Sequence, residues 1–320
     1  MQKYQVGIIG GAGYTAGELI RILRWHPAVE LSFIHSSSQA GKLVSEIHHD
    51  LAGEFFMIFS AEVDLSVDVL FLCSGHGKSK LWLEEHAVPA ETLVVDLSSD
   101  YRLDPSFVYG LPELNRKAIQ STSRVANPGC FATAIQLGLL PLAANQSLPE
   151  EVHIHAITGS TGAGQQPTGT THFSWRNNNL SIYKPFRHQH LAEIGRSLTQ
   201  LQAASEFDLA FLPIRGDFTR GIFASLYCKT DLTEQELQDL YEAYYASHAF
   251  TSFVTGNPHL KQVVNTNKCL VQVSKHGDRA LIVSVIDNLL KGASGQAVQN
   301  MNLALGLEET TGLHLKAMAF

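Results

Sequence analysis

The sequence predicts an α/β protein in which a Rossmann-type NADP-binding domain is followed by an α+β domain with a mixed sheet. Three observations lead to this fold class. Short apolar runs alternate with helix-like segments in the first half of the chain, a glycine-rich turn follows the first run, and longer extended segments replace this rhythm from about residue 151. Alternating strands and helices are typical of a parallel sheet covered on both faces. Successive extended segments pair into mixed or antiparallel sheets.

The elements of the first half follow from the spacing of apolar residues. Leu19, Ile20 and Leu23 share one face of a helix expected at residues 16–25, and a further helix is expected from Phe131 to Leu142. Short buried strands are expected at residues 6–9, 29–34, 69–73 and 92–97.

The second half predicts extended segments and a closing helix. The extended segments are expected at residues 153–158, 222–230, 269–275 and 280–286, and the helix-like run at 294–306. We expect this last run to return to the first domain. The cofactor domain would then comprise residues 1–129 with 294–320, and a catalytic and oligomerisation domain would comprise residues 130–293.

Composition indicates the general class of protein. The chain has 320 residues, 45% of them hydrophobic and 17% charged, which is enough for two domains. A net charge of −7 without a basic run argues against nucleic acid or an anionic membrane as the main partner. We find no secretory signal and no segment long enough to span a bilayer, so a cytoplasmic location is expected. The four cysteines have no short metal-ligand spacing, which predicts no metal and no disulfide.

A glycine-rich turn separates the first strand from the first helix. Small residues at this place let the backbone approach a pyrophosphate, and the helix N-terminus supplies a favourable field. Such a turn is a weak signal alone, but its position between an N-terminal strand and an amphipathic helix makes it strong. The residues expected to bind the cofactor here are Gly10, Gly11, Ala12, Gly13, Tyr14 and Thr15.

The end of the second strand indicates which dinucleotide is used. An NAD site carries Asp or Glu here for the ribose hydroxyls. This chain instead has a serine-rich segment, with Ser36 and Ser38 followed by Lys42. Hydroxyl groups and a lysine suit a 2′-phosphate, which favours NADP over NAD, although a plain serine-rich loop remains an alternative.

Cys130 is the candidate nucleophile. It follows Pro128 and Gly129 and stands directly before the helix expected at Phe131. The unpaired N–H groups and positive dipole end of that helix would favour thiolate over thiol. The turn also brings a backbone N–H close to whatever binds the sulfur, which suits an oxyanion. A small buried thiol that only fills a gap is the alternative.

A thiolate and a nicotinamide site in one chain indicate an aldehyde-level oxidoreductase that acts through a thioacyl enzyme. This chemistry needs a proton donor. His190 and Glu193 are three residues apart, so on a helix they share a face and the carboxylate would orient the imidazole. A surface or satisfied core position is the alternative for any one of the fifteen histidines.

With these motifs the chain resembles the N-acyl-gamma-glutamyl-phosphate reductases, an arginine-biosynthesis family related to aspartate-semialdehyde dehydrogenase. The resemblance covers nearly the whole length. The chain differs from most members of the family at Ala132 and Ala192, where proline is frequent. Residues 212–219 match loosely. The matching segments are residues 10–19, 40–43, 96–102, 109–113, 125–141, 159–164, 188–193, 220–222, 287–293 and 296–302.

The resemblance implies NADPH-dependent reduction of N-acetyl-gamma-glutamyl phosphate to its semialdehyde with release of phosphate. It implies that Cys130 is the nucleophile, His190 the acid/base and Glu193 its support. Residues near the nicotinamide would include Ser160, Gly162 and Asn288. Arg102 would bind phosphate, and Arg215 and Arg220 are further candidates for the substrate's carboxylate or phosphate. A homodimer or homotetramer is implied as well.

Other functions stay open from the sequence. The same chemistry would serve an N-succinylglutamyl, aminoadipyl or aspartyl phosphate, because a pocket one methylene longer or shorter separates such substrates. A non-catalytic NADP-binding redox sensor is compatible with the fold. Such a sensor would not need His190 and Glu193 beside its thiol.

Overall fold

The computed structural model describes residues 3–203 and 206–319. The chain divides into two units, Met1–Pro128 with Ala293–His314, and Gly129–Gly292 with Leu315–Phe320. The C-terminal segment therefore differs from the expected division. The backbone N–H groups of Met318 and Ala319 donate to carbonyl oxygens of Val264 and Lys261, which lie in the second unit. Among the residues described, no helix has the length and apolarity to cross a membrane.

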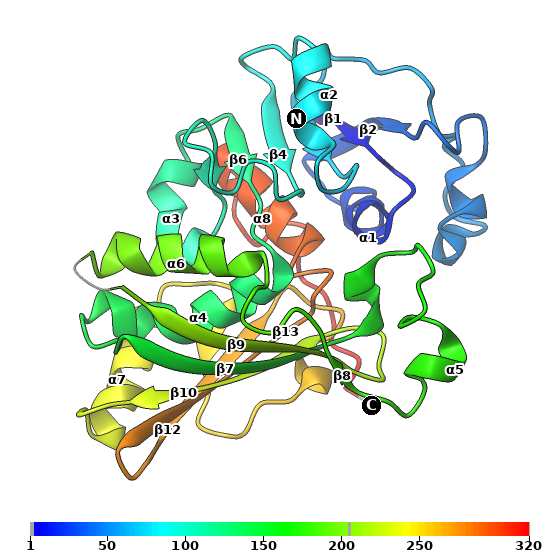
Figure 1. Ribbon diagram of the computed structural model, residues 1–320. Coiled ribbons are helices and arrows are strands. Elements are labelled where there is room, and N and C mark those ends of the chain that lie inside the picture. The colour runs from blue at the N-terminus through cyan, green and yellow to red at the C-terminus, as the bar shows by residue number, and fades with distance from the viewer. Residues whose placement is uncertain (1–2, 204–205, 320) are drawn as a thin grey trace. The chain divides into compact units, whose positions relative to one another are not determined.

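The first unit is a doubly wound α/β domain, as predicted (Figure 1). Its six strands are parallel and follow the order β2-β1-β3-β4-β6-β5. The strands are β1 (Tyr4–Ile9), β2 (Val29–His35), β3 (Val69–Leu72), β4 (Leu93–Asp96), β5 (Val108–Tyr109) and β6 (Arg124–Ala126). The helices are α1 (Tyr14–Leu23), α2 (Ser79–Glu85), α3 (Pro112–Ile119) and α8 (Ser294–Ala304), with short 3₁₀ turns η1 (Val44–Glu46) and η2 (His49–Leu51).

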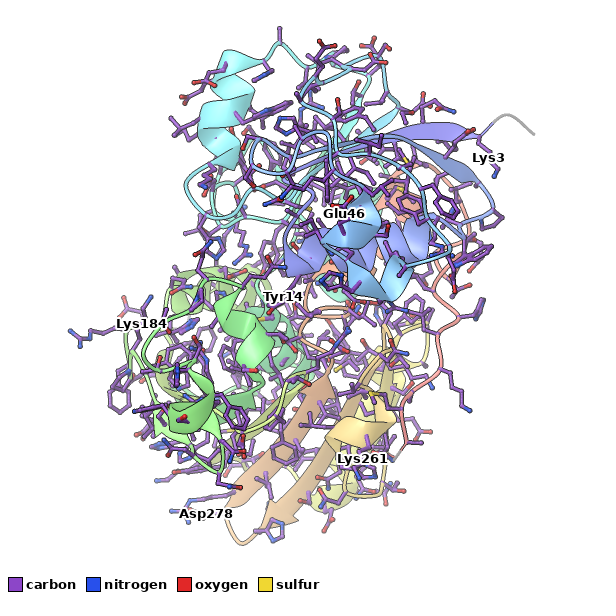
Figure 2. The ribbon with its side chains drawn as sticks, turned by 90° about the vertical axis from the view of Figure 1, so that its right-hand side faces the viewer. Lys3, Tyr14, Glu46, Lys184, Lys261 and Asp278 are labelled. Carbon is purple, nitrogen blue, oxygen red and sulfur yellow. The ribbon has the colours of Figure 1, made fainter. Side chains whose placement is uncertain are left out.

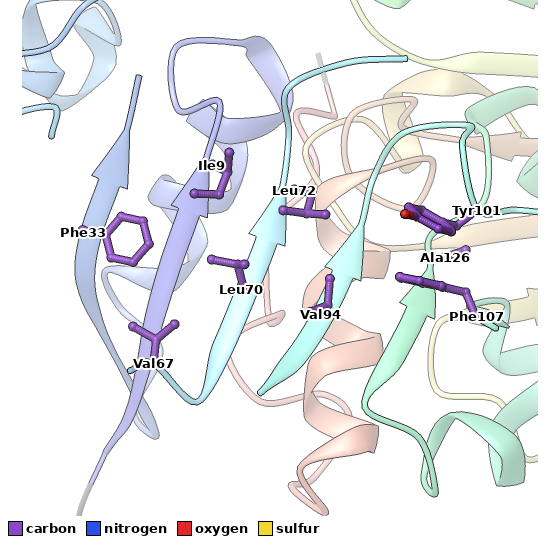
Figure 3. Packing of buried hydrophobic residues seen from close by; sticks show 9 residues of the cluster. All are labelled: Ile9, Phe33, Val67, Leu70, Leu72, Val94, Tyr101, Phe107 and Ala126. Atoms are coloured by element: carbon purple, nitrogen blue, oxygen red, sulfur yellow. The ribbon is translucent and has the colours of Figure 1, made fainter. Parts of the chain in front are cut away.

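The central strands of this sheet are buried along their whole length. All residues of β3 and β4 are buried, which explains why they read as continuous apolar runs. Figure 3 shows one part of the core, where Leu70, Leu72 and Val94 pack with side chains from neighbouring strands and loops. Trp82 and Leu83 of α2 pack against this cluster. The parallel arrangement places the carboxyl ends of β1 and β2 at one edge, where the glycine-rich turn begins.

The second unit contains a seven-stranded mixed sheet of order β11-β12-β13-β10-β7-β9-β8. Its strands are β7 (Glu151–Thr158), β8 (Ser181–Ile182), β9 (Asp208–Arg215), β10 (Ile222–Lys229), β11 (Thr251–Phe253), β12 (Cys269–His276) and β13 (Arg279–Ile286). Its helices are α4 (Cys130–Ala144), α5 (Phe173–Arg176), α6 (His190–Leu201) and α7 (Glu234–Tyr245), with 3₁₀ turns η3 (Ser160–Ala163) and η4 (Leu260–Gln262). β9 was absent from the expected strands, and Pro213 within it argues against a strand in the sequence.

Helices cover one face of this sheet. α4 packs on β10 and β13, α7 packs on β11 and β12, and α6 lies against α4 (Figure 1). Because α4 lies between the sheet and α6, residues 131–143 are all buried. The strands alternate accordingly, with Val152, Ile154 and Ala156 of β7 buried and their neighbours His153 and Ile157 half-buried on the opposite face. The helix-covered side is where Cys130 begins α4.

Candidate active site

The glycine-rich turn has the backbone geometry of an anion-binding loop. Gly10 has φ 80°, and a Cβ on it would lie 2.7 Å from backbone atoms of Ser74, so only glycine fits. The N–H groups of Gly10 and Gly11 donate to the carbonyl oxygen of His35 at the end of β2. Gly13 caps α1 without a side-chain cap bond, and in the described chain nothing lies within 4 Å of where its Cβ would be. The N-terminus of α1 is therefore open to a phosphate group.

The rest of the expected turn lies beside this opening. Ala12 precedes Gly13, and Tyr14 and Thr15 form the first turn of α1, with the Tyr14 side chain exposed (Figure 2). The sequence did not indicate a role for His48. Its Nε2 lies 2.8 Å from the carbonyl oxygen of Gly11, so the imidazole supports the turn. His48 lies between η1 and η2, far from Gly11 in the sequence, so no local pattern connects it with the turn.

The serine-rich segment after β2 lies at the edge of the same sheet. Ser36 is buried, and its N–H donates to the carbonyl oxygen of Ser60. Ser38 and Lys42 are exposed, and the Lys42 ammonium donates to Oε1 of Gln39 at 3.0 Å. Both side chains are therefore accessible to solvent. Their role in cofactor choice stays a prediction.

Cys130 is the first residue of α4, one residue earlier than the expected helix start. Gly129 is the N-cap residue, and the carbonyl oxygen of Gly129 accepts hydrogen bonds from N and Oγ1 of Thr133 at 2.8 and 3.0 Å. The first turn carries no acidic residue. The dipole of α4 therefore acts on the sulfur without a competing negative charge from its own turn.

The other three cysteines are poor nucleophiles. Burial, followed by the charge of Asp96, raises the pKa of Cys73 to about 12, and burial raises the pKa of Cys228 to about 11. Cys269 is fully buried, with its sulfur 3.5 Å from Oγ of Ser284. Cys130 is half-buried, as is Cys73, but of the four cysteines only Cys130 stands at the N-terminus of a helix. Its role as nucleophile stays a prediction.

His190 and Glu193 come together with the start of α4, because α6 begins at His190 and packs against α4. Nε2 of His190 lies 3.8 Å from Oε1 of Glu193, which is an ion-pair distance and longer than a hydrogen bond. The other carboxylate oxygen of Glu193 accepts the N–H of Gly129 at 3.1 Å. Both side chains are buried. Glu193 therefore connects the histidine with the nucleophile's turn, a contact that the i,i+3 spacing alone did not indicate.

His188 is a second buried histidine in this cluster, and the sequence assigned no role to it. Its ring centroid lies 4.5 Å from that of His190 and 5.5 Å from that of Phe131. Its Nδ1 accepts the N–H of His190 at 3.3 Å. Burial, and after it the charges of Lys184 and Arg215, lower the pKa of His188 to about 4. His188 is thus a neutral acceptor that orients the first residue of α6.

Tyr183 and Arg215 belong to the same cluster as His188. The pairing of β8 with β9 sets Ser181 opposite Arg215, and Cζ of Arg215 lies 4.6 Å from the centroid of the Tyr183 ring. Burial raises the pKa of Tyr183 to about 12, and the negative charge of Cys130 acts in the same direction. The centroid of the Tyr183 ring also lies 5.8 Å from that of His188. The sequence missed Tyr183, since only the strand pairing brings it here.

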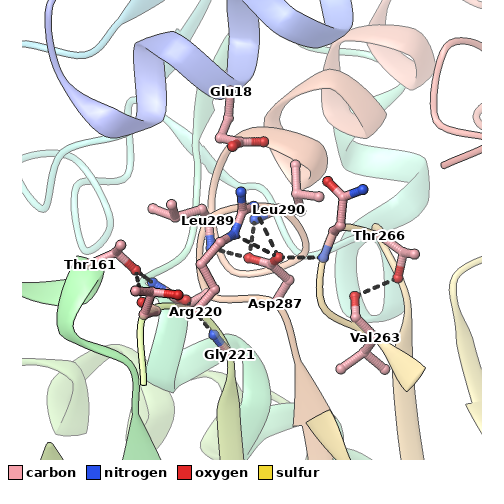
Figure 4. Close-up of polar contacts among 12 residues, drawn as sticks. Glu18, Thr161, Arg220, Gly221, Val263, Thr266, Asp287, Leu289 and Leu290 are labelled. Atoms are coloured by element: carbon pink, nitrogen blue, oxygen red, sulfur yellow. Dashed lines mark hydrogen bonds and ion pairs between the residues drawn. The ribbon is translucent and has the colours of Figure 1, made fainter. Parts of the chain in front are cut away.

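Asn288 and Arg220 lie at the ends of β13 and β10. Oδ1 of Asn288 accepts the N–H of Gly221 at 2.7 Å, and its Nδ2 donates to Oγ1 of Thr161 at 3.0 Å. Asn288 therefore holds the loop that contains the predicted residues Ser160 and Gly162. Figure 4 shows the neighbouring Asp287, whose Oδ2 accepts Nε of Arg220 at 3.1 Å. The guanidinium of Arg220 is thus committed to a fully buried carboxylate.

Arg102 lies in the first unit, between β4 and β5. It is 5% exposed, and its Nε donates to the carbonyl oxygen of Asn127 at 3.0 Å. A further bond runs from Nη2 to the carbonyl oxygen of Leu97 at 3.4 Å. Through these hydrogen bonds Arg102 holds the backbone at Asn127 and Leu97, which is a structural role. Its predicted contact with phosphate is not tested by this geometry.

Comparisons with known proteins match each of the two units to a known domain. A family model described as "Semialdehyde dehydrogenase, NAD binding domain" matches residues 5–122, and one described as "Semialdehyde dehydrogenase, dimerisation domain" matches residues 130–288. An N-acetyl-gamma-glutamyl-phosphate reductase of Parabacteroides distasonis is 58% identical over 98% of this chain and 99% of that protein. The enzyme of the same name from Flavobacterium johnsoniae is 56% identical, with 98% and 99% covered.

Solved structures share the fold at much lower identity. Aspartate semialdehyde dehydrogenase II of Vibrio cholerae has a TM-score of 0.76 and 18% identity, covering 96% of this chain and 99% of that one. Aspartate semialdehyde dehydrogenase with NADP from Candida albicans has a TM-score of 0.70 and 13% identity, covering 94% and 98%. These likenesses support the two-domain architecture and the doubly wound first domain.

Proposed function

The chain belongs to the N-acetyl-gamma-glutamyl-phosphate reductases, within the semialdehyde dehydrogenases, and from this we propose a residue-level account of its reaction. It is an NADP-dependent oxidoreductase of arginine biosynthesis that reduces N-acetyl-gamma-glutamyl phosphate to N-acetylglutamate 5-semialdehyde and phosphate. The observation that carries the residue assignment is the Glu193 carboxylate, which joins the turn of Cys130 to His190.

The first step is attack of the Cys130 thiolate on the acyl-phosphate carbonyl carbon. The C–S bond forms, the C–O bond to phosphate breaks, and phosphate leaves with the electron pair of that bond. The N–H of Gly129 is already donated to Glu193, so it does not serve the developing oxyanion. We assign that task to the backbone N–H groups of the first turn of α4, which point at the same region.

The second step converts the thioester to the aldehyde. NADPH, when bound at the turn of Gly10 to Thr15, supplies the hydride. His190 donates a proton to the oxygen of the resulting thiohemiacetal and takes it back when the C–S bond breaks and the aldehyde leaves. Glu193 stabilises the protonated imidazole. His188, kept neutral by its surroundings, orients His190 without competing for that proton.

Arg215 is the best placed of the three candidate arginines for an anionic group of the substrate. Its Nε is buried and lacks a hydrogen-bond partner within the part of the chain that the structure describes. Arg220 is held by Asp287, and Arg102 is held by backbone carbonyl oxygens. We therefore assign the substrate's carboxylate or phosphate first to Arg215, next to the ring of Tyr183.

We propose that the second unit also forms the contact between subunits. The sheet face opposite α4 and α7 carries half-buried apolar and aromatic side chains, among them Phe223, Tyr227 and Leu270. A second copy of this chain is the occupant that suits this face, because the match of residues 130–288 is to a dimerisation domain. A homodimer, or a homotetramer built from two dimers, follows. We assign cofactor binding to the first unit.

We also place the enzyme in the cytoplasm. The proposed mechanism needs a free thiolate at Cys130 and a supply of NADPH. A reducing compartment maintains both. Fractionation of cells that produce the tagged full-length chain tests this location, and recovery with an extracytoplasmic marker would contradict it.

The reaction is tested by running it in reverse. Purified protein receives N-acetylglutamate semialdehyde and NADP, with or without phosphate, and nicotinamide absorbance is followed for the native chain and for Cys130→Ser. We expect NADP reduction that requires phosphate and is lost in the variant. If the native chain is inactive, the succinyl, aminoadipyl and aspartyl semialdehydes are tried in turn. Activity with one of these changes the substrate, and inactivity with all of them contradicts the enzyme assignment.

A further inference from the structure

The two segments that connect the units meet beside the nucleophile. The chain leaves the first unit after Pro128 and returns to it at Ala293. Within the first unit, Nδ2 of Asn127 donates to the carbonyl oxygen of Ala293 at 3.0 Å. One side-chain hydrogen bond therefore joins the outgoing segment to the returning one, three residues before Cys130.

The returning segment also touches the nucleophile directly. A Cβ on Gly292 would lie 2.9 Å from Cβ of Cys130 and 2.7 Å from the carbonyl oxygen of Asn288. A side chain at Gly292 would displace one of these groups. The position of Cys130 thus depends on where the segment of Gly292 and Ala293 lies, which is the segment that Asn127 holds.

Both the backbone and the side chain of Asn127 make hydrogen bonds. Its N–H donates to the carbonyl oxygen of Asp96 at 2.8 Å, and its own carbonyl oxygen accepts Nε of Arg102 at 3.0 Å. Oδ1 of Asn127 accepts Nδ2 of Asn300, in α8, at 3.0 Å. The side chain is 1% exposed. Both the backbone and the amide of Asn127 are therefore held in place by groups from other parts of the first unit.

Asn300 sets the orientation of this amide. Its Nδ2 donates to two acceptors, Oδ1 of Asn127 and the carbonyl oxygen of Gly110, at 3.0 and 2.8 Å. These use both hydrogens of the amide. The reversed amide would turn Oδ1 of Asn300 toward two oxygens that accept but do not donate. Because Asn300 is fully buried, water does not replace the lost bonds cheaply.

We propose that Asn300 and Asn127 are positioning residues for the nucleophile. Asn300 orients the Asn127 amide. Asn127 joins the outgoing segment, which continues into the turn of Cys130, to the returning segment, whose Gly292 lies against Cys130. Neither side chain takes part in the chemistry. The effect on rate rests on the proposed function, because a displacement of about 1 Å of a reacting atom lowers a rate by up to roughly a hundredfold.

The alternative is an ordinary buried polar network that only stabilises α8. The chain offers a matched control in Asn302, which lies on the same helix and is also fully buried. Nδ2 of Asn302 donates to the carbonyl oxygens of Glu309 and Thr311 at 3.2 and 2.9 Å, and its Oδ1 lies 3.0 Å from Nε2 of His26. Truncating Asn302 removes three such bonds from the same helix, compared with two for Asn300, and none of the three involves Asn127.

The test compares Asn300→Ala with Asn302→Ala in the full chain. Three quantities are measured: the melting temperature, kcat and KM in the reductase assay, and the pH dependence of Cys130 alkylation by iodoacetamide, read from the Cys130 peptide by mass spectrometry. We expect both variants to melt at lower temperature. Only Asn300→Ala should lower kcat, by about tenfold or more, with an unchanged KM for NADPH. Only Asn300→Ala should change the alkylation profile.

Equal kcat and equal alkylation profiles in the two variants would overturn the proposal, whatever their melting temperatures. If Asn300→Ala does not fold, Asn300→Ser and Asn127→Ser are compared with Asn302→Ser under the same criteria. The alkylation profile does not depend on the reductase assay. A native chain without reductase activity would therefore contradict the proposed function, while the alkylation comparison still decides the positioning role.

Discussion

The two helix N-termini to which we assign the cofactor and the nucleophile are alike in sequence and differ in their surroundings. α1 and α4 each begin after a glycine N-cap, without a side-chain cap bond among the described residues and without an acid in the first turn. Gly13 faces open space, whereas the N–H of Gly129 is bonded to Glu193. α1 buries one face, and α4 is buried from residue 131 to 143. Both use the same positive dipole end to stabilise a negative charge.

On the proposed function, the difference follows from what each helix holds. A dinucleotide binds and leaves in every turnover, so the end of α1 needs to stay open to solvent. The thiolate is part of the chain, so α4 is enclosed and its N-cap residue is bonded to a buried carboxylate. The same helix-dipole effect would then stabilise an exchangeable ligand in the first unit and a permanent charge in the second.

The largest effect is expected at the enclosed helix. Cys130→Ser should lower kcat by at least about a thousandfold, since a hydroxyl near its ordinary pKa is a weak nucleophile. NADPH affinity, measured by quenching of protein fluorescence, should be unchanged because α1 is untouched. Cys73→Ser is the control and should retain activity. A kcat of Cys130→Ser within tenfold of the native value would remove Cys130 from the mechanism.

The next effect concerns the link between the two catalytic helices of the second unit. Glu193→Gln keeps an oxygen for the N–H of Gly129 but removes the charge beside His190, so kcat should fall by roughly tenfold to a hundredfold. The pH dependence of kcat should shift as the imidazole loses its neighbouring anion. Glu193→Ala, which also removes the bond to Gly129, should be slower still. Equal rates for the two variants would show that the bond to Gly129 does not matter.

The open helix offers a smaller and more selective change. Gly13→Asp provides an N-cap acceptor for α1, so stability should rise by a few tenths of a kcal/mol. Its negative charge occupies the place of the pyrophosphate, so KM for NADPH should rise by about tenfold, with kcat little affected. Gly13→Ala separates the effect of charge from that of bulk. An unchanged KM in Gly13→Asp would show that the cofactor does not approach this end of α1.

The smallest effect is a pH dependence of stability. The folded-state pKa of His188 is lowered to about 4 from 6.5. Between these two pKa values the unfolded chain binds more protons than the folded chain. As far as His188 is concerned, the free energy of unfolding is therefore highest above pH 6.5, decreases as the pH falls, and levels off below about 4. The pKa of His26 in the first unit is lowered as well, mainly by burial, which gives the same sign.

Calorimetry of the native chain, His188→Gln and His26→Gln over this range measures the effect. The melting temperature of each variant should fall by a few degrees less than that of the native chain between pH 7 and about pH 4.5. His188→Gln should show the larger difference, because the pKa of His188 is lowered as far as about 4. Identical slopes for all three chains would contradict the lowered pKa values.

The parts of the site that the sequence predicted are those with a local cause. The turn at Gly10 needs a backbone conformation that glycine adopts, and Cys130 stands where a loop meets a helix. His190 and Glu193 were predicted because one helical turn separates them. The role of Glu193 at Gly129 was not predicted, because 64 residues separate the two.

Sequence by itself thus determined the fold class and the two helix N-termini and predicted Cys130 as the nucleophile, since each depends on hydrophobic period, backbone freedom or capping within a few residues. Tertiary structure alone decided that Arg215 lies over the ring of Tyr183, that His188 stays neutral, and that Asn300 reaches Asn127 across 173 residues. Strand order and helix packing bring these groups together. Hydrogen bonds and desolvation arise only after these groups have come together, so no local sequence pattern predicts them.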